Sequence, residues 1–507
     1  MSDVVIACCD RAHVGDPDTA RAIAAGCEGA LEGLRVALVP DLCAGPADAR
    51  TDGAAGLVLG LCGPGPSSGD LQTLARRGGL DPFAVEAVDL GLLAALGPAA
   101  TLAERAAAVL VGAAAAIAAG IPTPPAHLRL RLGGDEVSRR ALLAGGTVSY
   151  RPVAAVARET CLGTDRCGAC VGACPVGAIA ASRPFPSVSS DACVGCAACV
   201  AACPVGAIGV GGAAAEQLEA RMDAVAAWPW TERPGVLFAC RGAARAASRR
   251  EPPAPGAAPP GAAPPGWTLV PVPCLASVTE GWLLQALAGG APAVGALGCG
   301  ERCGAASAPR VEARAAYVRA VAGDERVRIA RTDAPEALAP LLGPLPAAGP
   351  ASASPPLVHE PQATATALAA LAPGTLDVAG GPLGLPEVRA EGCTLCGTCA
   401  TLCPTAALRV EGTDQAPALT LDAGRCIACG HCVEVCPERV ISVARRTTAA
   451  TLAGRRTVKR AEAGRCRRCG APVAPAPMLE RIRDLLPDGS PALLDVLTGL
   501  CLDCRGR

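Results

Sequence analysis

The sequence is poor in aromatic side chains, with 3 Phe, 4 Trp and 2 Tyr among its 507 residues, and Lys459 is its only lysine. A core with so few aromatic rings is expected to consist of Leu, Val, Ile and Ala. The formal net charge is −1, and no basic stripe with interleaved aromatic residues occurs, so we expect no nucleic-acid partner. The length allows about three to five domains.

The familiar catalytic motifs are also missing. There is no Ser/His/Asp arrangement, no recognisable pair of carboxylates and no phosphate-binding loop, so we predict no catalytic residues. The turn over residues 63–68 contains two prolines and lacks the third glycine of a dinucleotide loop. The most apolar window, residues 106–121, is short, rich in Ala and interrupted by Gly112, which predicts a packed helix and no membrane span.

Cysteine, in contrast, is abundant, with 29 residues. No basic segment followed by an apolar run stands at the N-terminus, so we expect no secretory signal and a cytoplasmic location. Disulfides are disfavoured in a reducing compartment. Clustered thiols in such a protein are therefore predicted to bind metal.

One cysteine spacing, Cys-x2-Cys-x2-Cys-x3-Cys-Pro, occurs twice, over residues 393–404 and 426–437. Three thiolates two residues apart can wrap around an iron–sulfur cube, and in two-cluster ferredoxins the fourth thiolate reaches the other cluster. The predicted ligands of one [4Fe–4S] cluster are Cys393, Cys396, Cys399 and Cys436, and those of its neighbour are Cys426, Cys429, Cys432 and Cys403. Structural zinc, bound by four ligands in two knuckles, fits this array poorly.

A second block repeats the spacing with one defect. The complete run is Cys193, Cys196, Cys199 and Cys203, and the incomplete run has Thr164 in place of its leading cysteine. Cys-Pro-Val-Gly-Ala-Ile occurs at residues 174–179 and 203–208, which indicates an internal duplication. One predicted [4Fe–4S] ligand set is Cys193, Cys196, Cys199 and Cys174, and the other is Cys167, Cys170 and Cys203, completed by Cys161 if its loop is extended. Without Cys161, a [3Fe–4S] cluster or an open iron is expected, so we predict three or four cubes.

Residues 1–150 alternate short apolar runs with helical patterns. Strands are predicted at residues 4–8, 35–40 and 56–61, and a helix at 101–120 with Thr101 as its N-cap and Glu104 at its third position. This order predicts a small α/β domain with a parallel sheet. Four cysteines fall at or just past strand ends, where open α/β sheets bind ligands: Cys8, Cys9, Cys43 and Cys62. Alternatively, they are buried as small hydrophobes.

A further α/β pattern follows an expected helix at residues 213–228. Strands are predicted at 236–240, 267–274 and 293–299, and helices at 281–287 and 309–321. Because the strands end in cysteine, four thiols are expected at one sheet edge: Cys240, Cys274, Cys299 and Cys303. They suit a [2Fe–2S] cluster, with a four-cysteine zinc site or free thiols as alternatives.

The last 48 residues contain two Cys-x2-Cys knuckles separated by an expected helix at residues 478–486. The knuckles are formed by Cys466 with Cys469 and by Cys501 with Cys504. Paired knuckles of this kind are typical of structural zinc bound by four thiolates. A rubredoxin-like iron site is the alternative.

Two resemblances to known families emerge from these segments. Residues 4–9, 41–43 and 56–62, the last leading into 80–83, resemble the N-terminal domain of heterodisulfide reductase A subunits. Residues 238–240, 272–274, 286–291 and 298–303 resemble the delta (iron–sulfur) subunit of methyl-viologen-reducing hydrogenases. The second resemblance implies a [2Fe–2S] cluster that passes electrons between a hydrogenase and heterodisulfide reductase. The chain departs from it at Ala243, where a further cysteine is expected, and in the short Cys299–Cys303 spacing. No flavin domain is found.

The predicted fold class is multidomain α/β and α+β. It comprises two ferredoxin-like dicluster modules (151–212 and 391–445), two small α/β domains (1–150, and 213–331 with a Pro/Ala-rich insertion at 241–266), a linker (332–390) and a zinc-ribbon-like module (460–507).

The function expected from these motifs is electron transfer. We predict a subunit that relays electrons between a flavoprotein or hydrogenase partner and an acceptor in a cytoplasmic oxidoreductase complex. One alternative is a stand-alone oxidoreductase with an open cluster site near Cys161 and Cys167. The other is a redox-sensing or scaffold protein that docks through its zinc module.

Overall fold

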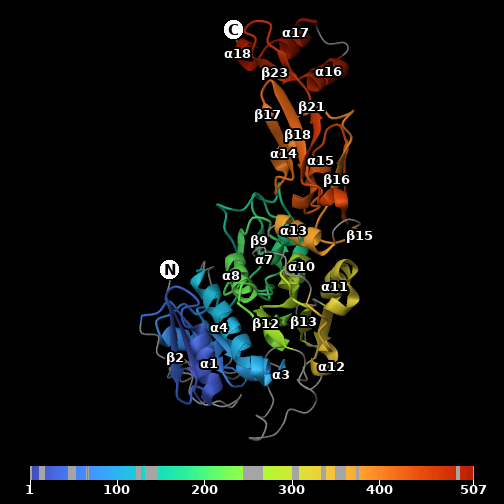
Figure 1. The fold of residues 1–507 in the computed structure, drawn as a ribbon. Helices are drawn as coiled ribbons and strands as arrows, with labels where there is room; N and C mark the ends of the chain where they lie inside the picture. Colours follow the sequence, from blue (N-terminus) through green and yellow to red (C-terminus); the bar gives the residue numbers. More distant parts are fainter. Residues whose placement is uncertain are drawn as a thin grey trace. The chain divides into compact units, whose positions relative to one another are not determined.

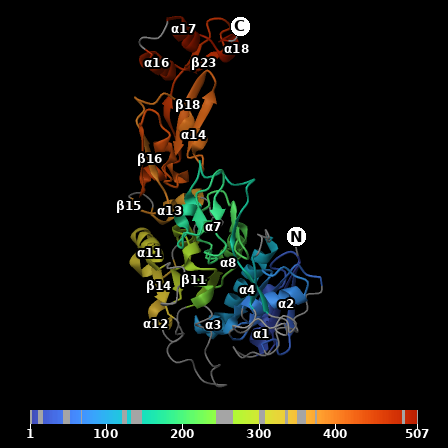
Figure 2. The same cartoon turned by 180° about the vertical axis from the view of Figure 1, so that it is seen from behind.

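Figures 1 and 2 show the fold of the computed structural model from two sides. The structure describes residues 3–10, 17–43, 53–63, 65–66, 68–120, 127–131, 147–243, 266–299, 308–332, 338–348, 361–372, 376–486 and 491–505. The chain divides into two compact units. Unit 1 comprises Met1–Gly163 and Ala169–His359, and unit 2 comprises Thr164–Gly168 and Glu360–Arg507.

Unit 1 opens with a parallel sheet in the strand order β2-β1-β3-β4, as the apolar runs predicted. The strands are β1 (Val4–Cys9), β2 (Leu34–Val39), β3 (Gly56–Leu61) and β4 (Val85–Asp89). Helix α2 (Ser68–Arg77) covers one face, and α1 (Pro17–Cys27) and α4 (Leu102–Ala118) cover the other (Figures 1 and 2). All four carboxyl ends therefore lie at one edge of the sheet.

The predicted packed helix, α4, is confirmed by its burial. Within the described residues, Ala99–Ala118 is long and apolar enough to cross a membrane, and 78% of the tested window is buried inside the protein. Gly112 lets α8 (Ala215–Ala226) approach closely, because a Cβ there would lie 3.1 Å from Arg221 O. Thr101 is the N-cap residue and Glu104 the third helical residue, as predicted, but the Thr101 side chain makes no capping hydrogen bond. The Thr101 hydroxyl donates to Pro98 O, and the Glu104 carboxylate accepts from the Thr231 amide.

A second parallel sheet in unit 1 has the order β12-β11-β13-β14, which confirms the three predicted strands. Its strands are β11 (Gly235–Cys240), β12 (Trp267–Val272), β13 (Val294–Gly298) and β14 (Val327–Arg331), and its helices are α10 (Glu280–Ala288) and α11 (Ala308–Ala322). The largest fully buried side chains include Trp267, Trp282 and Phe238. The expectation of a core without aromatic rings is thus wrong here, because the few aromatics are concentrated at its centre.

Several small antiparallel sheets accompany the cysteine runs. In the first block these are β7 (Ala154–Val156) with β10 (Ile208–Val210), β8 (Ile179–Ala180) with β9 (Ser187–Val188), and the helices α6 (Ala169–Ala173) and α7 (Ala198–Ala202). In the second they are β15 (Asp377–Ala379) with β20 (Arg446–Thr448), β16 (Leu385–Val388) with β19 (Ile441–Ala444), the sheet of β17 (Leu408–Thr413), β18 (Ala416–Asp422) and β21 (Arg455–Arg460), and the helices α14 (Thr398–Leu402) and α15 (His431–Glu434).

The stretch predicted to be a linker, residues 332–390, is more ordered than its composition suggests. It contains α12 (Leu338–Leu342) and α13 (Pro361–Leu371), and its last part forms β15 and β16, which pair with strands of the second cysteine block.

A hairpin of β5 (His127–Arg131) and β6 (Thr147–Arg151) lies in the first 151 residues. The C-terminal segment contains β22 (Ala463–Arg465), β23 (Pro472–Pro475), α16 (Ala476–Leu485), α17 (Pro491–Gly499) and α18 (Leu502–Arg505), and α3 (Leu90–Ala95) follows β4.

One buried cation joins the two parallel-sheet regions of unit 1. Arg105 on α4 is 1% exposed, and its guanidinium donates to Leu93 O at 2.6 Å and to Trp267 O and Pro98 O, both at 3.1 Å. Burial lowers the pKa of Arg105 to about 10. The arginine stays charged at neutral pH, and its hydrogen bonds link α3, the turn before α4 and β12.

Replacing Arg105 with Met should destabilise unit 1 by roughly 2–4 kcal/mol, because a hydrogen bond from a charged donor contributes about 1.5–3 kcal/mol, while the carbonyls of Leu93 and Pro98 keep other donors. All four tryptophans of the chain lie in unit 1, so denaturation followed by Trp fluorescence reports on this unit. The exposed Arg21, paired with Asp18, is the control, and R21M should change stability by at most about 1 kcal/mol. Equal effects of the two substitutions would contradict the role assigned to Arg105.

Candidate metal centres

The three complete cysteine runs fold into the same loop. In each, the residue before the second cysteine and the residue after it adopt positive φ angles: Gly195 and Ala197, Leu395 and Gly397, and Ala428 and Gly430, with φ from 52° to 83°. Turns of this kind aim successive backbone N–H groups into a concavity that binds anions, iron–sulfur clusters included. Left-handed conformations cost a residue with a Cβ about 1–2 kcal/mol. Their recurrence at non-glycine residues therefore marks a functional constraint.

The backbone that follows the cysteine before proline also has the same conformation in every run. The residue three positions later has positive φ in all four runs: Gly177, Gly206, Ala406 and Arg439. In the first block, the amide of Ala178 donates to Cys174 Sγ at 3.1 Å, and that of Ala207 donates to Cys203 Sγ at 3.2 Å. Hydrogen bonds to the sulfur ligands are one of the features that tune an iron–sulfur cluster. The duplicated sequence thus builds a duplicated sulfur site.

Three cavities each combine three cysteines of one run with the last cysteine of its partner run. Their sulfur donors are Cys393, Cys396, Cys399 and Cys436 in one, Cys426, Cys429, Cys432 and Cys403 in the next, and Cys193, Cys196, Cys199 and Cys174 in the third. These sets are the predicted crossed sets. Burial raises the pKa of Cys399 and of Cys432 to about 12. Thiols with pKa values this high are ionised at neutral pH only beside a cationic centre. The four sulfurs of each cavity therefore fit the iron of a cluster.

Comparison with protein families agrees with this geometry. Residues 160–208 and 392–441 both match the family model of the 4Fe-4S dicluster domain. A search of the curated proteins finds no match to the chain. The chain therefore carries two ferredoxin-type dicluster domains that bind 4Fe–4S clusters.

The incomplete run differs from the others in its backbone as well as in its sequence. Arg166 and Gly168 occupy the two left-handed positions of the loop, and neither has a positive φ. Cys170 lies on α6 where Cys199 lies on α7, and both are buried. Cys161, whose amide donates to Ala157 O, remains only a predicted fourth ligand. The loss of the leading cysteine thus accompanies a loss of the loop that cradles a cube.

The edge of the second parallel sheet carries the predicted [2Fe–2S] ligands. β11 ends at Cys240, Cys274 follows β12, and Cys299 follows β13 directly. A Cβ placed on Gly242 would lie 3.9 Å from Cys240 Sγ and 3.8 Å from Cys299 Sγ, so these two sulfurs face one small space. Cys303 lies outside the described residues. The ligand set of this site therefore stays a prediction.

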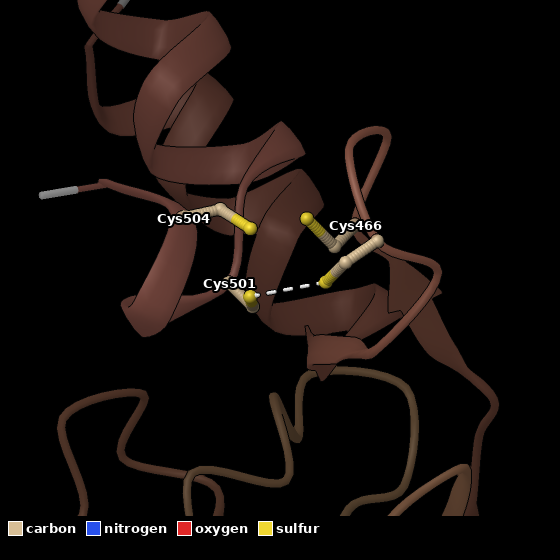
Figure 3. Close-up of side chains that lie close together, drawn as sticks. Cys466, Cys501 and Cys504 are labelled. Atoms are coloured by element: carbon tan, nitrogen blue, oxygen red, sulfur yellow. Dashed lines mark hydrogen bonds between the residues drawn. The ribbon is translucent and has the colours of Figure 1, made fainter. Parts of the chain in front are cut away.

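The two C-terminal knuckles meet in a single cluster of thiols (Figure 3). The sulfurs of Cys466, Cys469, Cys501 and Cys504 all lie within 4.8 Å of one another. Tetrahedral metal–sulfur bonds of about 2.3 Å place sulfurs about 3.8 Å apart, whereas a cube spreads them because each binds a different iron. Hydrogen bonds, the largest effect coming from the backbone of Cys501, lower the pKa of Cys466 to about 6. The arrangement fits one metal ion.

Lys459 is a functional candidate that the sequence analysis missed. Its ammonium donates to Ala390 O and to Cys393 O, both at 2.7 Å, from strand β21. Burial raises the pKa of Cys393, and the charge of Lys459 opposes that rise. A single lysine in a composition dominated by arginine gives no sequence signal. Its place beside a cluster ligand emerges only when β21 pairs with β18.

Replacing Lys459 with Met should make the reduction potential of the adjacent cluster more negative by roughly 30–60 mV, about 1 kcal/mol, because a nearby cation favours the reduced, more negatively charged cluster. Potentiometric titration monitored by EPR measures the change. K459R keeps the charge and should stay close to the wild-type potential, and both variants should keep their iron. A shift as large in K459R as in the Met variant would contradict an electrostatic role.

Proposed function

We propose that this chain is an electron-relay subunit of a cytoplasmic oxidoreductase complex. The observation that carries the proposal is a contact within unit 1. Cys196, a ligand candidate for a 4Fe–4S cluster, packs against the apolar cluster formed by Ala198, Cys274 and Ala276. Cys274 is a predicted ligand of the [2Fe–2S] site, so the contact would bring two redox centres of different domains side by side.

Two arginines of α11 hold this contact in place. The Arg314 guanidinium donates to Ala276 O at 3.0 Å and also to Val278 O, and Arg310 donates to Ala173 O at the end of α6. One helix thus braces both the sheet edge and the first dicluster domain. Because electron tunnelling slows steeply with distance, a fixed separation between centres favours transfer between them.

The chain's own residues supply binding and tuning, and the clusters supply one-electron chemistry. Cysteine thiolates would hold the iron, and backbone N–H groups donate to the sulfurs. Hydrogen bonding, local charge and solvent exposure set the potential of an iron–sulfur cluster. This distribution of roles supports a relay between a flavoprotein or hydrogenase donor and a separate acceptor. The resemblance of residues 238–303 to a hydrogenase subunit favours the hydrogenase as donor.

One observation favours a second candidate, a stand-alone oxidoreductase. Thr164 replaces a cluster ligand, and the loop after it lacks the left-handed turns of the complete runs. An iron with an open coordination position could bind a small substrate there. Turnover of a substrate by the isolated chain would support this candidate over the relay.

The relay predicts a defined metal content for protein purified without oxygen. Four cubes, one [2Fe–2S] cluster and the C-terminal metal correspond to ~18 iron with matching sulfide and at least ~1 zinc per chain. Elemental analysis with sulfide determination gives these numbers. About 8 iron together with several zinc ions would mean that the cysteines are largely structural, and the relay proposal would fail.

The role of Cys161 is tested by replacing it with Ala. If Cys161 is the fourth ligand of the incomplete set, C161A should convert one cube into a [3Fe–4S] cluster, because the unligated iron is lost. EPR of the oxidised protein detects this species, which is absent from the wild type under the same conditions. A [3Fe–4S] signal already present in the wild type, unchanged in C161A, would show that Cys161 is no ligand.

A further inference from the structure

The N-terminal sheet gathers three cysteines at one edge. β1 ends at Cys9, Cys43 lies four residues after β2, and Cys62 directly follows β3. These three strands are parallel neighbours, so their carboxyl ends meet. The three sulfurs lie within 4.8 Å of one another. The sequence placed these residues near strand ends but did not separate them from the neighbouring Cys8.

The loop that carries Cys43 is held by contacts on both sides. The Asp10 carboxylate accepts a hydrogen bond from the Asp41 amide at 3.2 Å, which ties the loop to the end of β1. Leu42 is fully buried in the apolar core on the α2 face of the sheet. The amide of Cys62 donates to Cys43 Sγ at 3.1 Å. Packing and hydrogen bonds therefore position the thiols.

Two nearby cysteines behave differently and serve as an internal comparison. The side chain of Cys8 lies on the opposite face of the sheet, where burial raises its pKa to about 12. Cys27 is fully buried against Ala107 O of α4. Both fill the core as small hydrophobes. Cys43, in contrast, is exposed and Cys62 is half-buried, so the three-thiol edge can be reached from solvent.

We propose that Cys9, Cys43 and Cys62 bind a single soft metal ion, Zn²⁺, with a fourth coordination position open to solvent. Sulfurs this close fit the spacing of about 3.8 Å set by one tetrahedral ion and are too close for a cube. Thiolate donors select zinc and other soft metals. The described part of the chain brings three donors together here, and three protein ligands with one free position is the pattern of reactive zinc sites, whereas structural sites have four. The edge is also where α/β sheets bind ligands.

The test is the zinc and iron content of the full chain, purified without oxygen from zinc-supplemented medium. The wild type should hold ~2 zinc, one here and one at the C-terminal knuckles. C43A and C62A should each lose ~1 zinc with iron unchanged. Because Cys43 is exposed, C43A should keep its fold, which circular dichroism checks. The control C27A should lose none. Loss of ~4 iron in C43A, or no change in any metal, would overturn the proposal.

The open position has its own test with cobalt(II) as the metal probe. In the C469A variant, which disables the C-terminal site, cobalt bound at the N-terminal site should change its visible spectrum when imidazole is added. In the C43A variant, cobalt at the closed four-thiolate site should not respond. A spectrum that is insensitive to imidazole in C469A would show that the fourth position is already filled by the protein.

Discussion

The structure depends on the electrostatic cost of placing many thiols together in apolar surroundings. Burial raises the pKa of Cys399, Cys426 and Cys432 well above neutral pH, and neighbouring thiols raise it further. Without a cationic partner these groups are neutral and bind nothing. A dicluster domain of about fifty residues buries only a small core, to which its own cysteines contribute, so we expect metal binding to be coupled to folding.

A comparison of the cysteine runs shows which parts of the loop depend on cluster binding. The left-handed positions recur in the three complete runs even where the residue is Leu395 or Ala428, for which the conformation is unfavourable. Where Thr164 removes a ligand, those turns disappear as well. The loop geometry and the cysteine are therefore lost together. This agrees with a conformation that is maintained because it surrounds a cluster and not because of local propensity.

The sequence predicted what local spacing determines and missed what tertiary packing determines. Cysteine spacing was enough to predict which cysteines line each shared cavity, and short apolar runs were enough to predict both parallel sheets. Thr101 is the N-cap residue as predicted, but its hydroxyl bonds to Pro98 and Arg105 and caps no helix amide. Lys459 carried no signal because its neighbour, Cys393, is 66 residues away. The group of Cys9, Cys43 and Cys62 could not be separated from Cys8 until the two faces of the sheet were known.

In both α/β sheets, the carboxyl ends of parallel strands meet at one edge and bring cysteines together there. At the second sheet, α7 of the first dicluster domain packs over the edge with Cys274, a cover that would favour passage of electrons to the proposed [2Fe–2S] cluster. At the first sheet, Cys43 is exposed, which would favour exchange of a ligand at the proposed zinc site. The same topology can therefore serve either of the two proposed sites. What distinguishes the two is whether a neighbouring domain covers the edge.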